Sequence, residues 1–227
     1  MTSLRRYLLG LDIYERHAVV SDILCRSDSR TVIDIGGTAG MLQMFSDRYM
    51  VTAVNVDDSG DVKYEGKRLP YADQTFDPAV CMDILEHTPP RSRNPFVEEL
   101  VGVAKGHVVS CGPLGSDFHP KNEIWRQTFG EYHRFLSEHI ENGLPTLAEI
   151  EGILAGKNYE LLFVGDVRLA GRLFLNELRI LRHSNPLVRR GLSLLAQALS
   201  VPRHRLKVAR EPNEFTNRVY AHVVSNG

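Results

Sequence analysis

The sequence predicts an α/β protein with a doubly wound, mostly parallel sheet, and three observations lead to that prediction. Residues 31–40 read TVIDIGGTAG, a run of β-branched residues followed by a glycine-rich turn. β-Branched residues suit a strand that is covered on both faces, and the glycines allow a sharp turn. Further short apolar strands follow, separated by segments with helical spacing. A length of 227 residues with 43% apolar residues fits one α/β domain with decorating segments.

The glycine-rich turn after the first strand carries the first candidate ligand-binding residues. Asp34 stands inside the end of the strand, and Gly36, Gly37 and Gly40 follow it. This spacing differs from the dinucleotide fingerprint GxGxxG. A carboxylate at this point is a poor neighbour for a pyrophosphate but a good one for an ammonium group. We therefore infer a nucleoside with a cationic amino-acid end, with a glycine-rich turn of another α/β fold as the alternative.

The elements around this turn follow from apolar spacing. A helix is expected over residues 11–24, ahead of the first strand, and another over residues 41–47, after the glycines. A second strand is expected over residues 49–56. An acid about twenty residues past the glycine turn is where a ribose diol is held in such folds. Asp57 is the first choice for this role, and Asn55 falls near the same position.

Four segments together resemble a known family. Residues 34–40, 54–58, 65–90 and 106–111 are similar, in order and spacing, to motifs of the class I S-adenosylmethionine-dependent methyltransferases. The subgroup is the one related to the ubiquinone and menaquinone methyltransferases, and LPYADQTFD followed by DILEH is the most specific part. The resemblance implies a Rossmann-like sheet of seven mostly parallel strands, with helices on both faces and helical lid insertions. It also implies S-adenosyl-L-methionine as cofactor and S-adenosyl-L-homocysteine as product.

The resemblance assigns roles to individual residues. Asp34 and Gly36 would border the methionine amino end, and Gly37 and Gly40 would border the sugar. Asn55 or Asp57 would contact the ribose, and Glu65 and Gly66 would contact the adenine. Asp83 and Ile84 would lie at the sulfonium, and His87 would lie next to them. The implied reaction is in-line displacement of a methyl group onto a small-molecule acceptor or a glycan or lipid precursor.

The segment after the fifth strand is rich in aromatic and histidine residues, and in this family it forms part of the acceptor pocket. His119, His133 and His139 are candidate bases for an acceptor that must lose a proton. The same histidines with Glu138 offer a candidate metal site. The spacing of His133 and His139 does not place both on one helix face. A helical lid with surface histidines is therefore favoured, and no metal is expected.

A basic segment near the end of the chain contrasts with an acidic remainder. Residues 168–210 contain ten arginines or lysines and one acid, so they carry a charge of +9 within a chain of net charge −1. Such a segment suggests an anionic partner, and solvated helix faces explain it equally well. Its apolar stripe is Val188, Leu192, Leu195 and Leu199. Packing on its own domain is favoured over a peripheral membrane contact, and a homodimer stays open.

The remaining features define the limits of the prediction. Three cysteines without ligand spacing fit a reducing cytoplasm. No basic groove with aromatic residues for base stacking is evident, so DNA or RNA is not favoured as the acceptor. A catalytically inactive cofactor-binding or scaffold protein on the same fold is the main alternative, while a nicotinamide-dependent oxidoreductase would need GxGxxG. We expect a single domain over 1–227, divided into an N-terminal helical cap (1–30), a cofactor-binding half (31–111), and an acceptor-side half (112–227) with helical insertions at 112–145 and 165–212.

Overall fold

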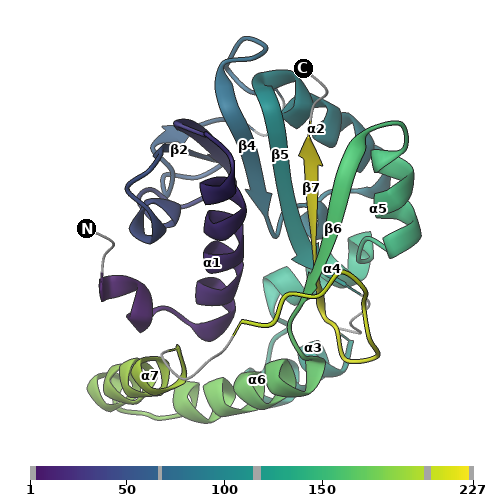
Figure 1. Ribbon diagram of the computed structural model, residues 1–227. Coiled ribbons are helices and arrows are strands. Elements are labelled where there is room, and N and C mark those ends of the chain that lie inside the picture. Colours follow the sequence, from purple (N-terminus) through teal and green to yellow (C-terminus); the bar gives the residue numbers. More distant parts are fainter. Residues whose placement is uncertain (1–3, 66–67, 115–118, 202–205, 225–227) are drawn as a thin grey trace.

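The computed structural model describes residues 4–65, 68–114, 119–201 and 206–224. Within these residues the chain forms one seven-stranded sheet in the order β3-β2-β1-β4-β5-β7-β6. The strands are β1 (Thr31–Ile35), β2 (Met50–Asn55), β3 (Val62–Lys63), β4 (Phe76–Met82), β5 (Ala104–Pro113), β6 (Asn158–Val164) and β7 (Arg218–Val224). Only β7 runs antiparallel to its neighbours, β5 and β6. The predicted doubly wound, mostly parallel sheet is confirmed (Figure 1).

Helices cover both faces of this sheet and one of its ends. The helical elements are η1 (Leu4–Leu8), α1 (Leu11–Arg26), η2 (Leu42–Phe45), η3 (Leu85–His87), α2 (Pro90–Val103), α3 (His119–Phe129), α4 (Arg134–Asn142), α5 (Leu147–Leu154), α6 (Val167–Leu181) and α7 (Pro186–Ser200). In Figure 1, α1 lies on one face of the sheet, α2 and α5 lie on the other, and α6 and α7 lie below the carboxyl ends of the parallel strands.

The alternation of side chains along each strand separates two hydrophobic cores. Ile33 and Ile35 of β1 point toward α2 and α5, in the core that also contains Leu100 and Leu154. Val32 belongs to the other core, beneath α1. Because successive side chains of a strand point to opposite faces, Asp34 shares the α1 side with Val32. A carboxyl group is thereby placed inside an otherwise apolar layer.

The segment after the glycine turn differs from its prediction. We expected a helix over residues 41–47, and the structure has only the four-residue 3-10 helix η2. Leu42 and Phe45 are both buried at a spacing of three, which is the period of a 3-10 helix. The side-chain amide of Gln43 then donates to the carbonyl oxygens of Ser46 and Tyr49, each at 2.8 Å. These bonds turn the chain into β2 before an α-helix can extend.

The order of the strands locates the site. Chain order reverses at β1, which pairs with β2 on one side and with β4 on the other, both parallel. In doubly wound sheets ligands bind outside the carboxyl ends of the strands at such a reversal. The glycine turn leaves β1 at this point, and Asp83 and Ile84 follow β4 directly beside it.

Candidate functional site

The glycine turn is closely packed against its neighbours. The Gly36 amide donates to the Val54 carbonyl oxygen at 2.7 Å, which ties the turn to β2. A Cβ atom at Gly36, where φ is +76°, would lie 2.1 Å from the Ile84 side chain. A Cβ atom at Gly37 would lie 2.2 Å from the Asp34 carboxylate. By contrast, nothing lies within 4 Å of the Cβ position of Gly40, so the backbone there is open to a ligand.

Asp34 is the most unusual residue of the site. Its side chain is fully buried, and neither carboxylate oxygen has a hydrogen-bond partner among the described residues. Burial raises the pKa of Asp34 to about 7, while the nearby positive charge of Arg16 lowers it in part. Buried carboxylates are expensive unless they are paired. An ammonium group placed against Asp34 would supply the missing partner.

Two arginines meet at a second carboxyl group, that of Asp83. Arg16 from α1 and Arg218 from the start of β7 both form ion pairs with Asp83, which follows β4. Burial would raise the pKa of Asp83, but Arg218 and Arg16 hold it below its ordinary value. One carboxylate thus neutralises only one of two guanidinium groups. The Nε atom of Arg16 is buried and has no hydrogen-bond partner within the described part of the chain.

The two ribose candidates have different surroundings. The side-chain amide of Asn55 donates to the carbonyl oxygens of Gly36 (3.1 Å) and Gly37 (3.2 Å) and to the Ser59 hydroxyl (3.0 Å). Asn55 therefore holds the glycine turn in place, a role that a carboxylate cannot perform because it has no hydrogen to donate. Asp57 is exposed on the following loop, where its carboxylate accepts from the Ser59 amide at 2.8 Å.

The other predicted cofactor residues lie around the same edge of the sheet. Glu65 is exposed just after β3, and Gly66 lies outside the described residues. The side chain of Ile84 covers Gly36, and its carbonyl oxygen accepts from the His87 amide and the Thr88 hydroxyl, both at 3.0 Å. The Asp83 backbone has a φ of +54°, and its amide donates to the Cys111 carbonyl oxygen at 2.9 Å.

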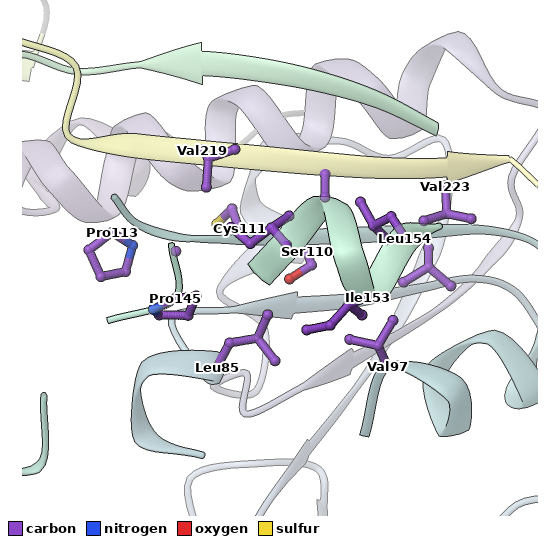
Figure 2. Close-up of a pocket in the computed structure, with 14 residues that line it drawn as sticks. Leu85, Val97, Ser110, Cys111, Pro113, Pro145, Ile153, Leu154, Val219 and Val223 are labelled. Atoms are coloured by element: carbon purple, nitrogen blue, oxygen red, sulfur yellow. The ribbon is translucent and has the colours of Figure 1, made fainter. Parts of the chain in front are cut away.

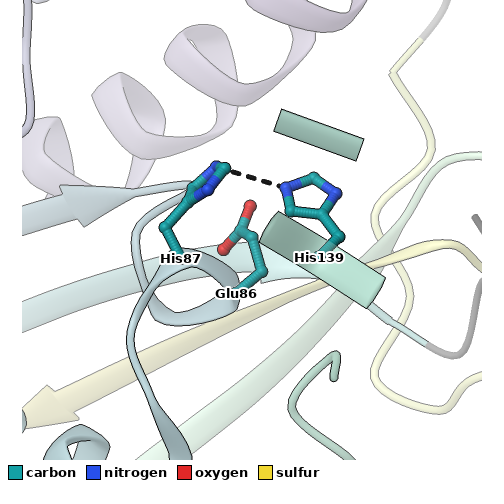
Figure 3. A group of neighbouring side chains, drawn as sticks. All are labelled: Glu86, His87 and His139. Atoms are coloured by element: carbon teal, nitrogen blue, oxygen red, sulfur yellow. Dashed lines mark hydrogen bonds between the residues drawn. The ribbon is translucent and has the colours of Figure 1, made fainter. Parts of the chain in front are cut away.

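Figure 3 shows a second polar group, in which Glu86 and His87 of η3 meet His139 of α4. The two histidine Nε2 atoms lie 3.2 Å apart, and the Nδ1 atom of His87 lies 2.8 Å from the Glu138 carboxylate. Burial and the neighbouring Asp83 raise the pKa of Glu86 to about 8. Burial and the neighbouring His87 lower the pKa of His139 to about 4, so this ring is neutral at pH 7.

This group contains the donor types of a metal site, because one ligand atom from each of Glu86, His87 and His139 lies within 4.8 Å of the others. The combination predicted from the sequence was different, since it joined His119, His133 and Glu138 to His139. The residues Glu86 and His87 were missed as partners of His139 because they stand 52 and more positions earlier in the chain. Only tertiary packing of α4 on η3 brings them together.

His133, the second candidate base, is not part of this group. His133 precedes α4, and its ring packs edge-on against Trp125 of α3 with centroids 4.4 Å apart. Its backbone amide donates to the buried Asn122 at 2.8 Å, so His133 helps to join α3 to α4. Burial lowers the pKa of His133. The side chain of His119 lies outside the described residues.

Sequence reasoning missed a buried arginine that holds the lid helices to the sheet. Arg93 of α2 is 1% exposed, and it binds both carboxylate oxygens of Glu149 on α5 at 2.8 and 2.9 Å. It also donates to the carbonyl oxygens of Leu85 in η3 and of Asn142 and Gly143 at the end of α4. Its only sequence signal is a charged residue at the start of a helix that the stripe Phe96, Val97, Leu100 and Val101 predicts over residues 93–104.

Two cavities flank the site and differ in size. The larger, of about 430 Å³, lies between α1, α6 and the ends of β5 and β6, and Arg218 is part of its lining. Its α6 wall is mostly apolar (Leu169, Leu173 and Phe174). Charged residues of both signs line the rest, namely the acids Asp12, Glu15, Asp166 and Glu177 and the bases Lys121, Lys207 and Arg218. The smaller cavity, of about 30 Å³, lies between β5, β7 and α5 and is almost wholly apolar (Figure 2). It has room for little more than one water molecule, so it is a packing gap.

Comparison with known proteins gives a result only at the level of structure. No family model matches the chain, and no curated protein sequence matches it significantly. Among solved structures, the Haemonchus contortus phosphoethanolamine N-methyltransferase 2, in complex with phosphomonomethylethanolamine and S-adenosylhomocysteine, has a TM-score of 0.54 at 14% identity. That match covers 99% of this chain and 61% of the other. This chain has a methyltransferase fold.

Two further structures agree on that fold. A putative sarcosine dimethylglycine methyltransferase from Galdieria sulphuraria has a TM-score of 0.51 at 11% identity, covering 92% of this chain and 84% of that one. The plantazolicin methyltransferase BpumL, in complex with SAH, has a TM-score of 0.50 at 13% identity, covering 98% of this chain and 84% of that one. At such low identities the methyltransferase fold is shared, and residue roles must be argued from the site.

Proposed function

We propose that this protein is an S-adenosylmethionine-dependent methyltransferase. The observation that carries the proposal is the pair of buried groups at the sheet reversal. The Asp34 carboxylate has no hydrogen-bond donor and the Arg16 Nε atom has no acceptor among the described residues. A free amino-acid end, with an ammonium and a carboxylate, complements both at once. A nucleoside that carries such an end is S-adenosylmethionine.

The surrounding residues fit the rest of that ligand. Asp34 would bind the ammonium group, and Arg16 would bind the carboxylate. Gly40 leaves space for the sugar, and Asp57 offers a carboxylate oxygen to the ribose hydroxyls. Glu65 and Gly66 would meet the adenine, as the resemblance to the ubiquinone and menaquinone subgroup implies. Solved structures of the same fold support this cofactor, since two of them are complexes with S-adenosylhomocysteine.

The chemistry asks little of the protein beyond alignment. S-adenosylmethionine supplies a methyl group that is already activated by the sulfonium. Holding the acceptor in line with it can contribute about 7–11 kcal/mol to lowering the barrier. If the acceptor must lose a proton, His87 is oriented for the task by the Glu138 carboxylate, with His139 beside it. Of the predicted bases whose side chains the structure describes, His139 lies in this group and His133 does not.

The cavity of about 430 Å³ is the proposed acceptor site. It adjoins Arg218, which belongs to the cofactor site, so an acceptor there would approach the sulfonium from the β5 and β6 side. Its apolar α6 wall and its charged residues of both signs suit a small molecule with an apolar part and a polar or charged part. A glycan or lipid precursor has this character.

The cytoplasm is the expected compartment, and no helix of the described residues is long and apolar enough to cross a bilayer.

The test compares two ligands by calorimetry. S-adenosylhomocysteine carries the amino-acid end, and 5′-methylthioadenosine lacks it. We expect the wild-type protein to prefer S-adenosylhomocysteine strongly, and Asp34→Asn and Arg16→Gln each to reduce this preference by about tenfold or more. Equal affinity of the wild type for both ligands would contradict the proposal. A methyl-release assay with candidate acceptors then separates an enzyme from a catalytically inactive cofactor-binding protein.

A further inference from the structure

Helix α7 has its apolar side turned outward. Every residue of this helix is described, and none of the 15 is buried. Val188, Leu192, Leu195 and Leu199 recur at helical spacing and form one stripe. All four are exposed, Leu195 by 55%. The polar residues Ser193, Gln197 and Ser200 form the half-buried side instead. This is the reverse of the arrangement that a helix adopts when it covers its own domain.

The stripe is part of a larger surface, which we call the α7 surface. It consists of the apolar residues Leu187, Val188, Leu192, Leu194, Leu195 and Leu199 together with Arg189 and Arg190. Leu187 is 79% exposed. Helix η1 packs against α7 and adds Leu8, which is 47% exposed. Isolated exposed leucines are ordinary, but a continuous group of this kind indicates a surface that is covered in use.

The charges on α6 and α7 are predominantly positive. Residues 167–200 contain six arginines and a single acid, Glu177, and α7 itself contains no acid. At 100° per residue, Arg189 and Arg190 stand at opposite borders of the apolar side of α7. Neither forms an ion pair with a described residue. Long basic side chains at the borders of an apolar helix face are suited to the boundary between acyl chains and headgroups.

The position of the helix relates this surface to the acceptor cavity. In Figure 1, α6 and α7 lie side by side beneath the carboxyl ends of the parallel strands. Leu169, Leu173 and Phe174 of α6 line the cavity of about 430 Å³. A body that covers α7 would therefore lie at the same end of the molecule as that cavity.

We propose that α7 lies flat on an anionic lipid membrane, with its leucines in the interface and its arginines on the headgroups. A second copy of the chain is a poorer occupant. Pairing α7 with another α7 would bring Arg189 and Arg190 of both chains together, with no acid on either helix to neutralise them. Anionic headgroups supply the missing negative charge. The proposal stands on α7 alone and does not depend on which reaction the protein catalyses.

The experiment is co-sedimentation of the whole protein with lipid vesicles. Vesicles of phosphatidylcholine with phosphatidylglycerol should bind the wild type, vesicles of phosphatidylcholine alone should bind it weakly, and added salt should weaken binding. The double variant Leu192→Ser with Leu195→Ser should lose about tenfold or more in vesicle affinity, as should Arg189→Gln with Arg190→Gln. Both variants change exposed side chains, so folding and S-adenosylhomocysteine affinity should be unchanged.

Met50→Ser is the matched control. Met50 is 71% exposed at the amino end of β2, away from α7, and its loss should leave vesicle binding unchanged. Three outcomes would overturn the proposal. The wild type does not bind anionic vesicles, the leucine variant binds them as well as the wild type does, or ultracentrifugation shows a dimer that the leucine variant abolishes. In the last case a second copy of the chain covers the α7 surface.

Discussion

Two regions depart in opposite ways from the usual burial of apolar and exposure of polar side chains. One is the point at β1 where the strand order reverses, and the other is helix α7. At the reversal, Asp34 is fully buried and lacks a hydrogen-bond partner among the described residues. On α7, leucines face solvent while serine and glutamine residues face the domain. A buried charge without a partner costs free energy, and so does an exposed apolar stripe. The first departure concerns a single carboxyl group, whereas the second extends along a whole helix.

The difference indicates what each region binds. A buried carboxylate without a partner fits the charged end of a small ligand, because only a complementary charge offsets the free energy of burying it. An exposed helix face of leucines bordered by arginines fits an extended partner with an apolar interior and an anionic surface. Substitutions in each region test whether the two behave in these ways.

Arg93 provides the reference for a buried charge that has all its partners. Replacing it with methionine leaves the Glu149 carboxylate and the carbonyl oxygens of Leu85 and Asn142 without their donor. We expect Arg93→Met to lower the free energy of unfolding by about 3 kcal/mol, measured by urea denaturation. Full stability in this variant would mean that buried charges in this molecule tolerate the loss of their partners.

Asp34→Asn should raise the free energy of unfolding, which is the opposite of the effect expected for Arg93→Met. The folded state keeps the Asp34 proton up to about pH 7, while the unfolded state loses it above its ordinary value of 3.8. Stability therefore falls as the pH rises through that window, and the full cost is present above pH 7. Asparagine removes the charge, so at pH 8 the ligand-free variant should be more stable by roughly 2 kcal/mol.

The comparison at low pH serves as the control for Asp34→Asn. Near pH 4 both the aspartic acid and the asparagine are neutral in the folded state, so the difference in unfolding free energy should nearly disappear. A variant that is less stable than the wild type at pH 8 would show that Asp34 is already well compensated in the ligand-free protein.

Asn55→Asp tests the scaffold around the buried Asp34 carboxylate. The new carboxylate would face the carbonyl oxygens of Gly36 and Gly37, to which the amide now donates. We expect a loss of about 1–3 kcal/mol in unfolding free energy and weaker S-adenosylhomocysteine binding, measured by denaturation and calorimetry. If Asn55 instead contacts the ribose directly, the carboxylate should strengthen binding.

The smallest effect on stability is expected on α7. Leu192→Ser with Leu195→Ser removes side chains that are 41% and 55% exposed. The free energy of unfolding should change by no more than about 0.5 kcal/mol, in thermal or urea denaturation without lipid. A large loss would show that the leucines stabilise the fold itself, and would reduce the contrast between the two regions.

Local sequence patterns predicted most of the fold. The sequence predicts strands over residues 31–35 and 218–224, and β1 and β7 have these bounds, because runs of β-branched residues bounded by turns leave few alternatives. Thr146 followed three residues later by Glu149 predicts a capping box at a helix start, and the Thr146 hydroxyl accepts from the Glu149 amide at 3.1 Å at the start of α5. The capping box is only half formed, because the Glu149 side chain binds Arg93 instead of returning to Thr146. That competition depends on tertiary packing.

The sequence of residues 168–200 predicts one continuous basic helical stretch, and the structure divides it into α6 and α7. A signal for the division was present in the sequence. Asn185 caps α7 by accepting from the amides of Leu187 (2.9 Å) and Val188 (3.3 Å), and Pro186 takes the first helical position. Asparagine followed by proline is a common start for a helix. Which side of α7 faces outward could not be read from the sequence, because periodicity gives a stripe but not its direction.

The candidate site was predicted in position but not in its contacts. Asp34, the glycines and Asp83 were expected near the cofactor, and they do lie together at the sheet reversal. The arginines that pair with Asp83 lie 67 and 135 positions from it in the chain, so no local pattern could connect them. The charges that define the site thus arise from tertiary packing, which brings α1 and the start of β7 to Asp83 at the carboxyl end of β4.

The most direct test of the central claim is the affinity for S-adenosylhomocysteine at pH 6 and at pH 8, measured by calorimetry in the wild type and in Asp34→Asn. With a pKa of about 7, the ionised fraction of Asp34 falls about tenfold over that range, and only the ionised form attracts the ammonium group. We predict wild-type binding about tenfold weaker at pH 6, and weak, pH-independent binding in Asp34→Asn. Equal affinities of the two proteins at pH 8 would contradict the account.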